Sequence, residues 1–156
     1  MSSKETFDEQ VLRFHHEIVE LIKKYQFRDR NEIVCCGVSV SQCYTLETLY
    51  REGSLTMNRL AGKLHLSVST VTRVVEHLVK KQLVRREKDP HDRRFHSIRL
   101  TDKGQQMYRA SWQNIFESEK TILHHFPAEH RHLLIDMLAK LNHSVGQWQS
   151  CCTRKG

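Results

Sequence analysis

The chain has little proline and glycine and no long apolar run. Its 156 residues include only 2 prolines and 6 glycines, with 38% hydrophobic and 28% charged residues. This composition is typical of one globular domain and excludes a collagen-like or disordered chain. No segment reaches the about 18 consecutive apolar residues of a membrane span, and the N-terminus lacks the apolar core of a signal peptide. We therefore expect a cytoplasmic protein without a membrane partner.

The motifs of common enzyme classes are also missing from the sequence. There is no phosphate-binding glycine loop, no G-x-S-x-G nucleophile turn and no H-E-x-x-H zinc motif. Cys35 or Cys36 beside a histidine could imitate a nucleophile and base, but nothing in the sequence brings such a pair together. We expect no enzymatic activity.

Positive charge, in contrast, is plentiful and concentrated in one segment. The chain has 25 Lys and Arg against 18 Asp and Glu, a net charge of +7. Residues 56–104 hold twelve of the basic and five of the acidic side chains, so they account for the whole excess. Such a segment is either a solvated basic face or a surface that contacts phosphates.

Apolar periodicity and helix caps predict a mainly α fold with a small β-hairpin. Helices are expected at about 7–27, 39–52, 56–65, 67–81 and 102–125, and beyond Pro127, with two strands on either side of the turn Asp89-Pro90-His91-Asp92. Ser39 and Gln42 form a capping-box pattern, and Gly53 is placed to end that helix.

The third and fourth helices have the spacing of a helix-turn-helix. Counted from Met57, apolar residues fall at positions 4, 8, 10, 15 and 18, namely Leu60, Leu64, Leu66, Val71 and Val74. Small Ala61 stands where the two helices would cross, and His65 occupies the turn position where glycine is usual. In DNA-binding proteins of this type the second helix enters the major groove.

Polar side chains near the start of that second helix are candidates for DNA contact. They are Ser67, Ser69, Thr70, Thr72 and Arg73. Hydroxyls can bind phosphates or bases, and arginine can bind guanine through two hydrogen bonds. Alternatively, Ser67 and Ser69 only cap the helix.

The hairpin carries a second motif. Asp89-Pro90-His91-Asp92-Arg93-Arg94 and Leu100-Thr101-Asp102-Lys103-Gly104, preceded by LAxxLxLSxSTVTRxVxxL, closely resemble the signature of the MarR family of winged-helix regulators. The resemblance implies a single domain over residues 1–156. Residues 56–104 would form its winged helix-turn-helix lobe, and residues 7–27 and 102–150 its helical dimerisation region.

The same resemblance implies a homodimer that binds double-stranded DNA at a pseudo-palindromic operator, usually as a repressor. It assigns Arg94 to the minor groove, Arg93 to a phosphate, and Asp92 to bracing the arginines. A narrow minor groove favours an inserted guanidinium. The alternatives are a solvated arginine pair on a loop and a winged-helix adaptor that binds protein rather than DNA.

The five cysteines, Cys35, Cys36, Cys43, Cys151 and Cys152, suggest a thiol-based effector site. They could react with an oxidant or bind a thiophilic metal or metalloid, although no cofactor is identified by the sequence. If Cys36 and Cys43 were both helical they would lie roughly 10 Å apart, too far for one disulfide. Alternatively, Cys43 is a small core residue. A small organic effector in an interhelical cleft, or no effector, are the other interpretations.

Overall fold

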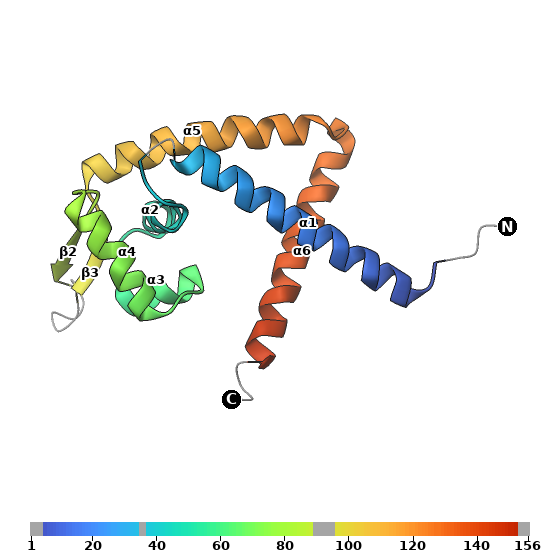
Figure 1. The fold of residues 1–156 in the computed structure, drawn as a ribbon, viewed down its shortest axis with the longest axis horizontal. Helices are drawn as coiled ribbons and strands as arrows, with labels where there is room; N and C mark the ends of the chain where they lie inside the picture. Colours follow the sequence, from blue (N-terminus) through green and yellow to red (C-terminus); the bar gives the residue numbers. More distant parts are fainter. Residues whose placement is uncertain (1–4, 35–36, 89–95, 153–156) are drawn as a thin grey trace. The chain divides into compact units, whose positions relative to one another are not determined.

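The computed structural model describes residues 5–34, 37–88 and 96–152. Its contacts divide the chain into two compact units, Met1–Asn114 and Ile115–Gly156, with the division inside one long helix. The elements in chain order are α1 (Phe7–Val34), α2 (Val40–Glu52), β1 (Leu55–Thr56), α3 (Met57–Leu64), α4 (Val68–Lys80), β2 (Val84–Lys88), β3 (His96–Leu100), α5 (Asp102–His124) and α6 (Ala128–Cys152) (Figure 1). The fold is mainly helical with a small β wing, as predicted.

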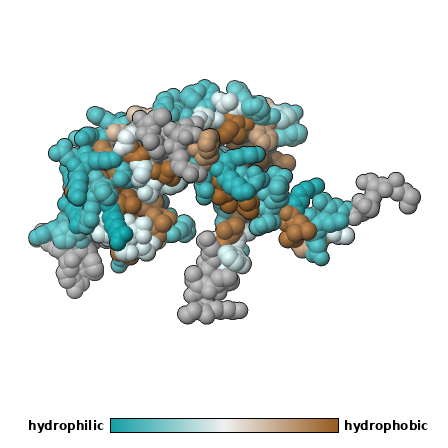
Figure 2. Space-filling model, in the orientation of Figure 1, coloured by the Kyte–Doolittle hydropathy of each residue, from teal (hydrophilic) through white to brown (hydrophobic). Residues whose placement is uncertain are grey.

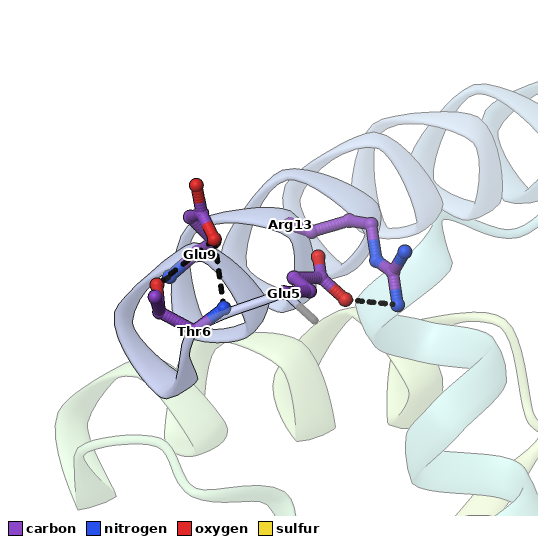
Figure 3. Close-up of polar contacts among 4 residues, drawn as sticks. All are labelled: Glu5, Thr6, Glu9 and Arg13. Carbon is purple, nitrogen blue, oxygen red and sulfur yellow. Dashed lines mark hydrogen bonds and ion pairs between the residues drawn. The ribbon is translucent and has the colours of Figure 1, made fainter. Parts of the chain in front are cut away.

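Helix α1 begins at a capping box that satisfies amide groups of its first turn. The Glu9 amide donates to Thr6 Oγ1 at 3.3 Å, and the Thr6 amide donates to Glu9 Oε2 at 2.7 Å. Arg13 pairs with Glu5, which precedes the helix, at 3.2 Å (Figure 3). The hydrogen bonds from Thr6 lower the pKa of the Glu9 carboxyl, since they stabilise its charged form.

The end of α1 was predicted wrongly. The apolar repeat stops near Phe27, but the helix continues to Val34. Asp29 is buried there, and its Oδ1 accepts hydrogen bonds from Arg28 Nε at 3.1 Å and from the second Arg28 nitrogen at 2.8 Å. Tyr44 of α2 donates its hydroxyl to the other Asp29 oxygen. The helix therefore extends through a buried polar cluster, which a search for apolar periodicity does not detect.

Helix α2 begins and ends at the predicted residues. Ser39 caps it, with both hydrogen bonds of the capping box to Gln42 formed, and Gly53 ends it at φ +79°. Val38 and Cys43, on either side of the cap, are both buried, as is typical of the apolar pair that often accompanies a capping box.

The sheet has three antiparallel strands in the order β1-β3-β2. Leu55 pairs with Ile98, and Val84 pairs with Leu100. The predicted hairpin is therefore present, but β1 was not predicted. Two residues carry no alternation pattern, so only the tertiary pairing identifies them as a strand.

The core of the first unit lies where α2, α3, α4 and the sheet meet. Leu46, Leu60 and Leu78 are fully buried, whereas Leu66 of the helix-turn-helix pattern and the nearby Val68 are not. Leu66 is 39% exposed and Val68 is 44% exposed. Both flank the cap Ser67, where the chain turns between the helices and neither helix covers them.

The second unit consists of the end of α5 and all of α6. Pro127 precedes α6, and its carbonyl accepts the His130 amide at 3.0 Å. Among the described residues, no helix is both long enough and apolar enough to cross a bilayer.

Candidate nucleic-acid interface

Helices α3 and α4 form the predicted helix-turn-helix. Thr56 caps α3 through its side chain, and Ala61 is buried where the helices approach each other. His65 ends α3 in the left-handed region at φ 54° and ψ 38°, a conformation that glycine adopts at lower cost. The turn thus keeps the usual geometry although its usual residue is replaced.

The hydroxyls at the start of α4 form one hydrogen-bonded cluster. Ser67 Oγ accepts the Thr70 amide at 3.2 Å and lies 2.7 Å from Thr70 Oγ1 and 3.0 Å from Ser69 Oγ. Thr72 donates its hydroxyl to the Val68 carbonyl at 2.8 Å. Ser67 is therefore the helix cap, as one interpretation held. The cluster is exposed at the N-terminus of α4, where amides and the helix dipole favour an anion.

The outward face of α4 is defined by residues one or two helical turns apart. Val71, Val75 and Leu78 are 0% exposed, and Ser69, Arg73 and Glu76 lie exposed on the opposite side. Neither the Arg73 nor the Glu76 side chain has an ion pair or hydrogen bond within the described part of the chain. Sequence analysis missed Glu76, although its spacing of three from Arg73 places it on the same face.

The wing strands present further cations that sequence analysis counted but did not assign. Arg85 and Arg99 are direct partners in the β2–β3 register, and both are exposed. Like charges in opposite positions repel each other. Arg85 is compensated by Glu87 at 2.5 Å, whereas Arg99 has no ion pair among the residues that the structure describes. Figure 2 shows a largely hydrophilic surface over this part of the molecule.

Asp92, Arg93 and Arg94 lie outside the described residues. The strands that flank them are in register as far as the pair Lys88 and His96. The segment 89–95 therefore joins the ends of two paired strands, as the wing prediction requires.

The motif Leu100-Thr101-Asp102-Lys103-Gly104 fixes the corner between α4 and α5. Thr101 donates its hydroxyl to the Gln82 carbonyl at 2.7 Å, and its amide donates to the Leu83 carbonyl at 3.1 Å. Lys103 Nζ donates to the Lys81 carbonyl at 3.0 Å. A Cβ on Gly104 would lie 1.9 Å from the Leu83 oxygen, so only glycine fits there. This part of the motif is structural and holds the C-terminal end of α4 in place.

The predicted cysteine site is only partly within the described structure. Cys43 is 2% exposed in α2, which agrees with a core role. Cys35 and Cys36 lie outside the described residues, and Cys151 and Cys152 are in the last turn of α6 with side chains that are not described. Within the described ranges, no three His, Cys, Asp or Glu side chains group as metal ligands.

An open groove of about 290 Å³ runs between α2 and α3. Tyr44, Glu47 and Arg51 line it from α2, and Lys63 and Leu64 line it from α3. Lys63 pairs with Glu52 at 2.9 Å and lowers the pKa of that carboxyl. The groove combines apolar and charged groups of both signs.

Comparison with known proteins agrees with this geometry. The model of the MarR family matches residues 38–96. HTH-type transcriptional regulator YdgJ of Bacillus subtilis is 31% identical over 127 residues, which cover 78% of this chain and 77% of YdgJ.

Two solved structures share the fold. A MarR family protein from Bacillus stearothermophilus is 23% identical, with a TM-score of 0.82 over 90% of this chain and 99% of that one. The DNA complex of MepR from S. aureus is 24% identical, with a TM-score of 0.72 over 85% of this chain and 97% of that one.

The family consists of transcription regulators rather than enzymes, which confirms the prediction that the protein has no enzymatic activity. The helix-turn-helix, the three-stranded wing and the match to YdgJ lead to one conclusion. This chain belongs to the MarR family of DNA-binding, helix-turn-helix transcriptional regulators.

Proposed function

We propose that the protein is a repressor that binds a pseudo-palindromic operator as a homodimer. The observation that carries the proposal is the outward face of α4, where Arg73 is exposed with no partner among the described residues, beside the hydroxyl cluster of Ser67, Ser69 and Thr70. An exposed guanidinium on a recognition helix is suited to guanine in the major groove. Repression is the usual mode of action in this family.

In this proposal the helix and the wing have different tasks. Arg73 reads bases, and the hydroxyls of Ser69, Thr70 and Thr72 contact phosphates or base edges. Arg94 enters the minor groove, Arg93 binds a phosphate, and Asp92 orients the two arginines. Arg99 extends the cationic surface along the wing.

The exposed apolar side chains support the homodimer. In α1, Phe7 is 77% exposed and Leu12 is 70% exposed, and in α6, Trp148 is 67% exposed. Apolar side chains reach the surface near the N-terminal end of α1 (Figure 2). Monomers rarely expose so many large apolar side chains, so we assign residues 7–27 and 102–150 to a dimer interface. In this proposal the dimerisation region and the winged helix-turn-helix lobe at 56–104 belong to one domain.

The experiment that tests DNA reading compares three arginine variants. A duplex enriched from a random pool by the wild-type protein is titrated with R73A, R94A and R51A. We expect R73A and R94A each to weaken specific binding by about tenfold or more, with unchanged thermal stability. R51A removes the same charge from the exposed C-terminal end of α2, outside residues 56–104 and outside the assigned dimer interface, and serves as the control. Unchanged affinity in both R73A and R94A would refute the assignment.

We further propose that a thiol-reactive oxidant, metal or metalloid releases the DNA through Cys35 or Cys36. These residues directly precede Gly37 and the cap of α2. Cys151 and Cys152 are candidate second ligands, whereas burial shields Cys43. C35S or C36S should abolish the response to a thiophilic metal and keep basal DNA binding. An unchanged response in both variants would exclude this site.

A small organic effector is the second candidate, because the groove between α2 and α3 offers about 290 Å³ and charges of both signs. If both C35S and C36S lose the response to the thiophilic metal, the groove is excluded as the sole effector site. A protein-binding adaptor is the remaining alternative, and it predicts binding to duplex DNA no tighter than that of other basic proteins.

A further inference from the structure

Lys81, at the end of the recognition helix, connects that helix to the start of α2. It is the C-cap residue of α4, and its amide donates to the His77 carbonyl at 3.1 Å. Its ammonium donates to the Gly37 carbonyl at 2.6 Å and to Gln42 Oε1 at 3.1 Å. These two acceptors are separated from Lys81 by 44 and 39 positions in the sequence, so the contacts join distant segments.

The acceptors are themselves held in place. Gln42 is the third residue of α2, and its Oε1 also accepts the Ser39 amide at 3.3 Å as part of the capping box. Gln42 is 9% exposed. Gly37 has φ +72°, a left-handed conformation that suits glycine, and it directly follows Cys36 in the sequence. One ammonium therefore bridges the cap of α2 and the residue after the cysteine pair.

A second lysine fixes the same end of α4 from the other side. Lys103 Nζ donates to the Lys81 carbonyl at 3.0 Å. The C-cap residue of α4 is thus bound through its side chain to Gly37 and α2 and through its backbone carbonyl to the start of α5. Lys80, its neighbour, is exposed and has no such contact among the described residues.

We propose that Lys81 is a positioning residue for DNA reading: it sets the orientation of α4 by tying its C-terminal end to Gly37 and Gln42. Its exposed ammonium is hydrogen-bonded to these two protein acceptors and is not left for a phosphate. This inference rests on the DNA-binding role proposed above for α4.

The test separates positioning from phosphate contact by the salt dependence of binding. Full-length K81M, K80M and wild-type protein are titrated against the enriched duplex and against a scrambled duplex at several salt concentrations. We expect K81M to bind the enriched duplex about tenfold more weakly, with scrambled-duplex affinity and salt slope unchanged. A phosphate-contacting lysine would instead weaken both duplexes equally and reduce the salt slope by about 1.

The conservative variants K81R and K81Q complete the test and replace K81M if that variant does not fold. Arginine keeps charged donors and should restore most of the discrimination between the two duplexes, whereas glutamine should restore less. Equal loss on both duplexes, a reduced salt slope, or wild-type discrimination in K81M would overturn the inference. Failure of the wild-type protein to enrich any duplex would instead overturn the proposed function.

Discussion

Two helical glycines should respond to alanine substitution with opposite signs. In Gly104→Ala the new Cβ would lie 1.9 Å from the Leu83 oxygen and 3.3 Å from Leu100 Cδ2. An ordinary contact between carbon and oxygen is about 3.3 Å or more, so the two groups must separate by roughly 1.4 Å. The Leu83 carbonyl cannot move freely, because it accepts the Thr101 amide at 3.1 Å and Leu83 is 1% exposed.

The magnitude follows from these contacts. Overpacking costs about 1–3 kcal/mol, and weakening the hydrogen bond to Thr101 adds about 1 kcal/mol. We therefore expect Gly104→Ala to lower the free energy of unfolding by about 2–4 kcal/mol. At about 2–4 °C per kcal/mol for a chain of this size, Tm should fall by roughly 4–16 °C.

Gly62→Ala is the matched control. Nothing lies within 4 Å of the position its Cβ would take in α3, so alanine adds helix propensity at no steric cost. The expected gain is roughly 0.5–1 kcal/mol. Urea denaturation followed by circular dichroism measures both variants. Equal stability of Gly104→Ala and the wild-type protein would refute the packing described for the α4–α5 corner.

Three further predictions follow from single contacts. Gln82 adopts φ 60°, so Gln82→Gly should relieve left-handed strain and raise the free energy of unfolding by roughly 0.5–1 kcal/mol. Urea denaturation measures this change, and a lower free energy of unfolding in the variant would contradict the strain. Tyr44 donates to buried Asp29, and Tyr44→Phe should cost about 1–2 kcal/mol. Burial, and then Asp29, raise the pKa of Tyr44 above its usual 10.0, so the unfolded chain loses this proton first. Wild-type stability should therefore fall above about pH 10 more steeply than that of Tyr44→Phe, and equal slopes would contradict this. Glu76→Gln removes a negative charge from the outward face of α4 and should tighten binding to non-specific duplex several-fold, whereas Glu129→Gln in α6 should not.

Most of the fold could be predicted because its signals are local. Capping residues indicate where a helix begins, and Ser39 and Ser67 are the N-caps of α2 and α4, as predicted. The end of α1 and the strand β1 were missed because they depend on tertiary contacts. Asp29 is helical and buried because Arg28 and Tyr44 satisfy it, and β1 exists only through its pairing with β3.

The candidate interface was predicted in type but not in full. Residue chemistry identified Arg73, and its spacing could also have identified Glu76. Lys81 could not have been assigned, since its partners Gly37 and Gln42 are far away in the sequence. Its side chain would be counted as one more surface cation by any argument from charge alone. In the structure its ammonium is instead hydrogen-bonded to Gly37 and Gln42.

The central claim is that residues 56–104 concentrate the net charge of +7 on a surface that binds duplex DNA. Its most direct test is the affinity of wild-type protein for the enriched duplex between 50 and 200 mM salt, a range over which six to ten phosphate contacts would cost about 10³–10⁵-fold. The account predicts a loss of about a thousandfold or more, with a log–log slope near −6 or steeper. An affinity that changes less than about tenfold over this range would contradict it.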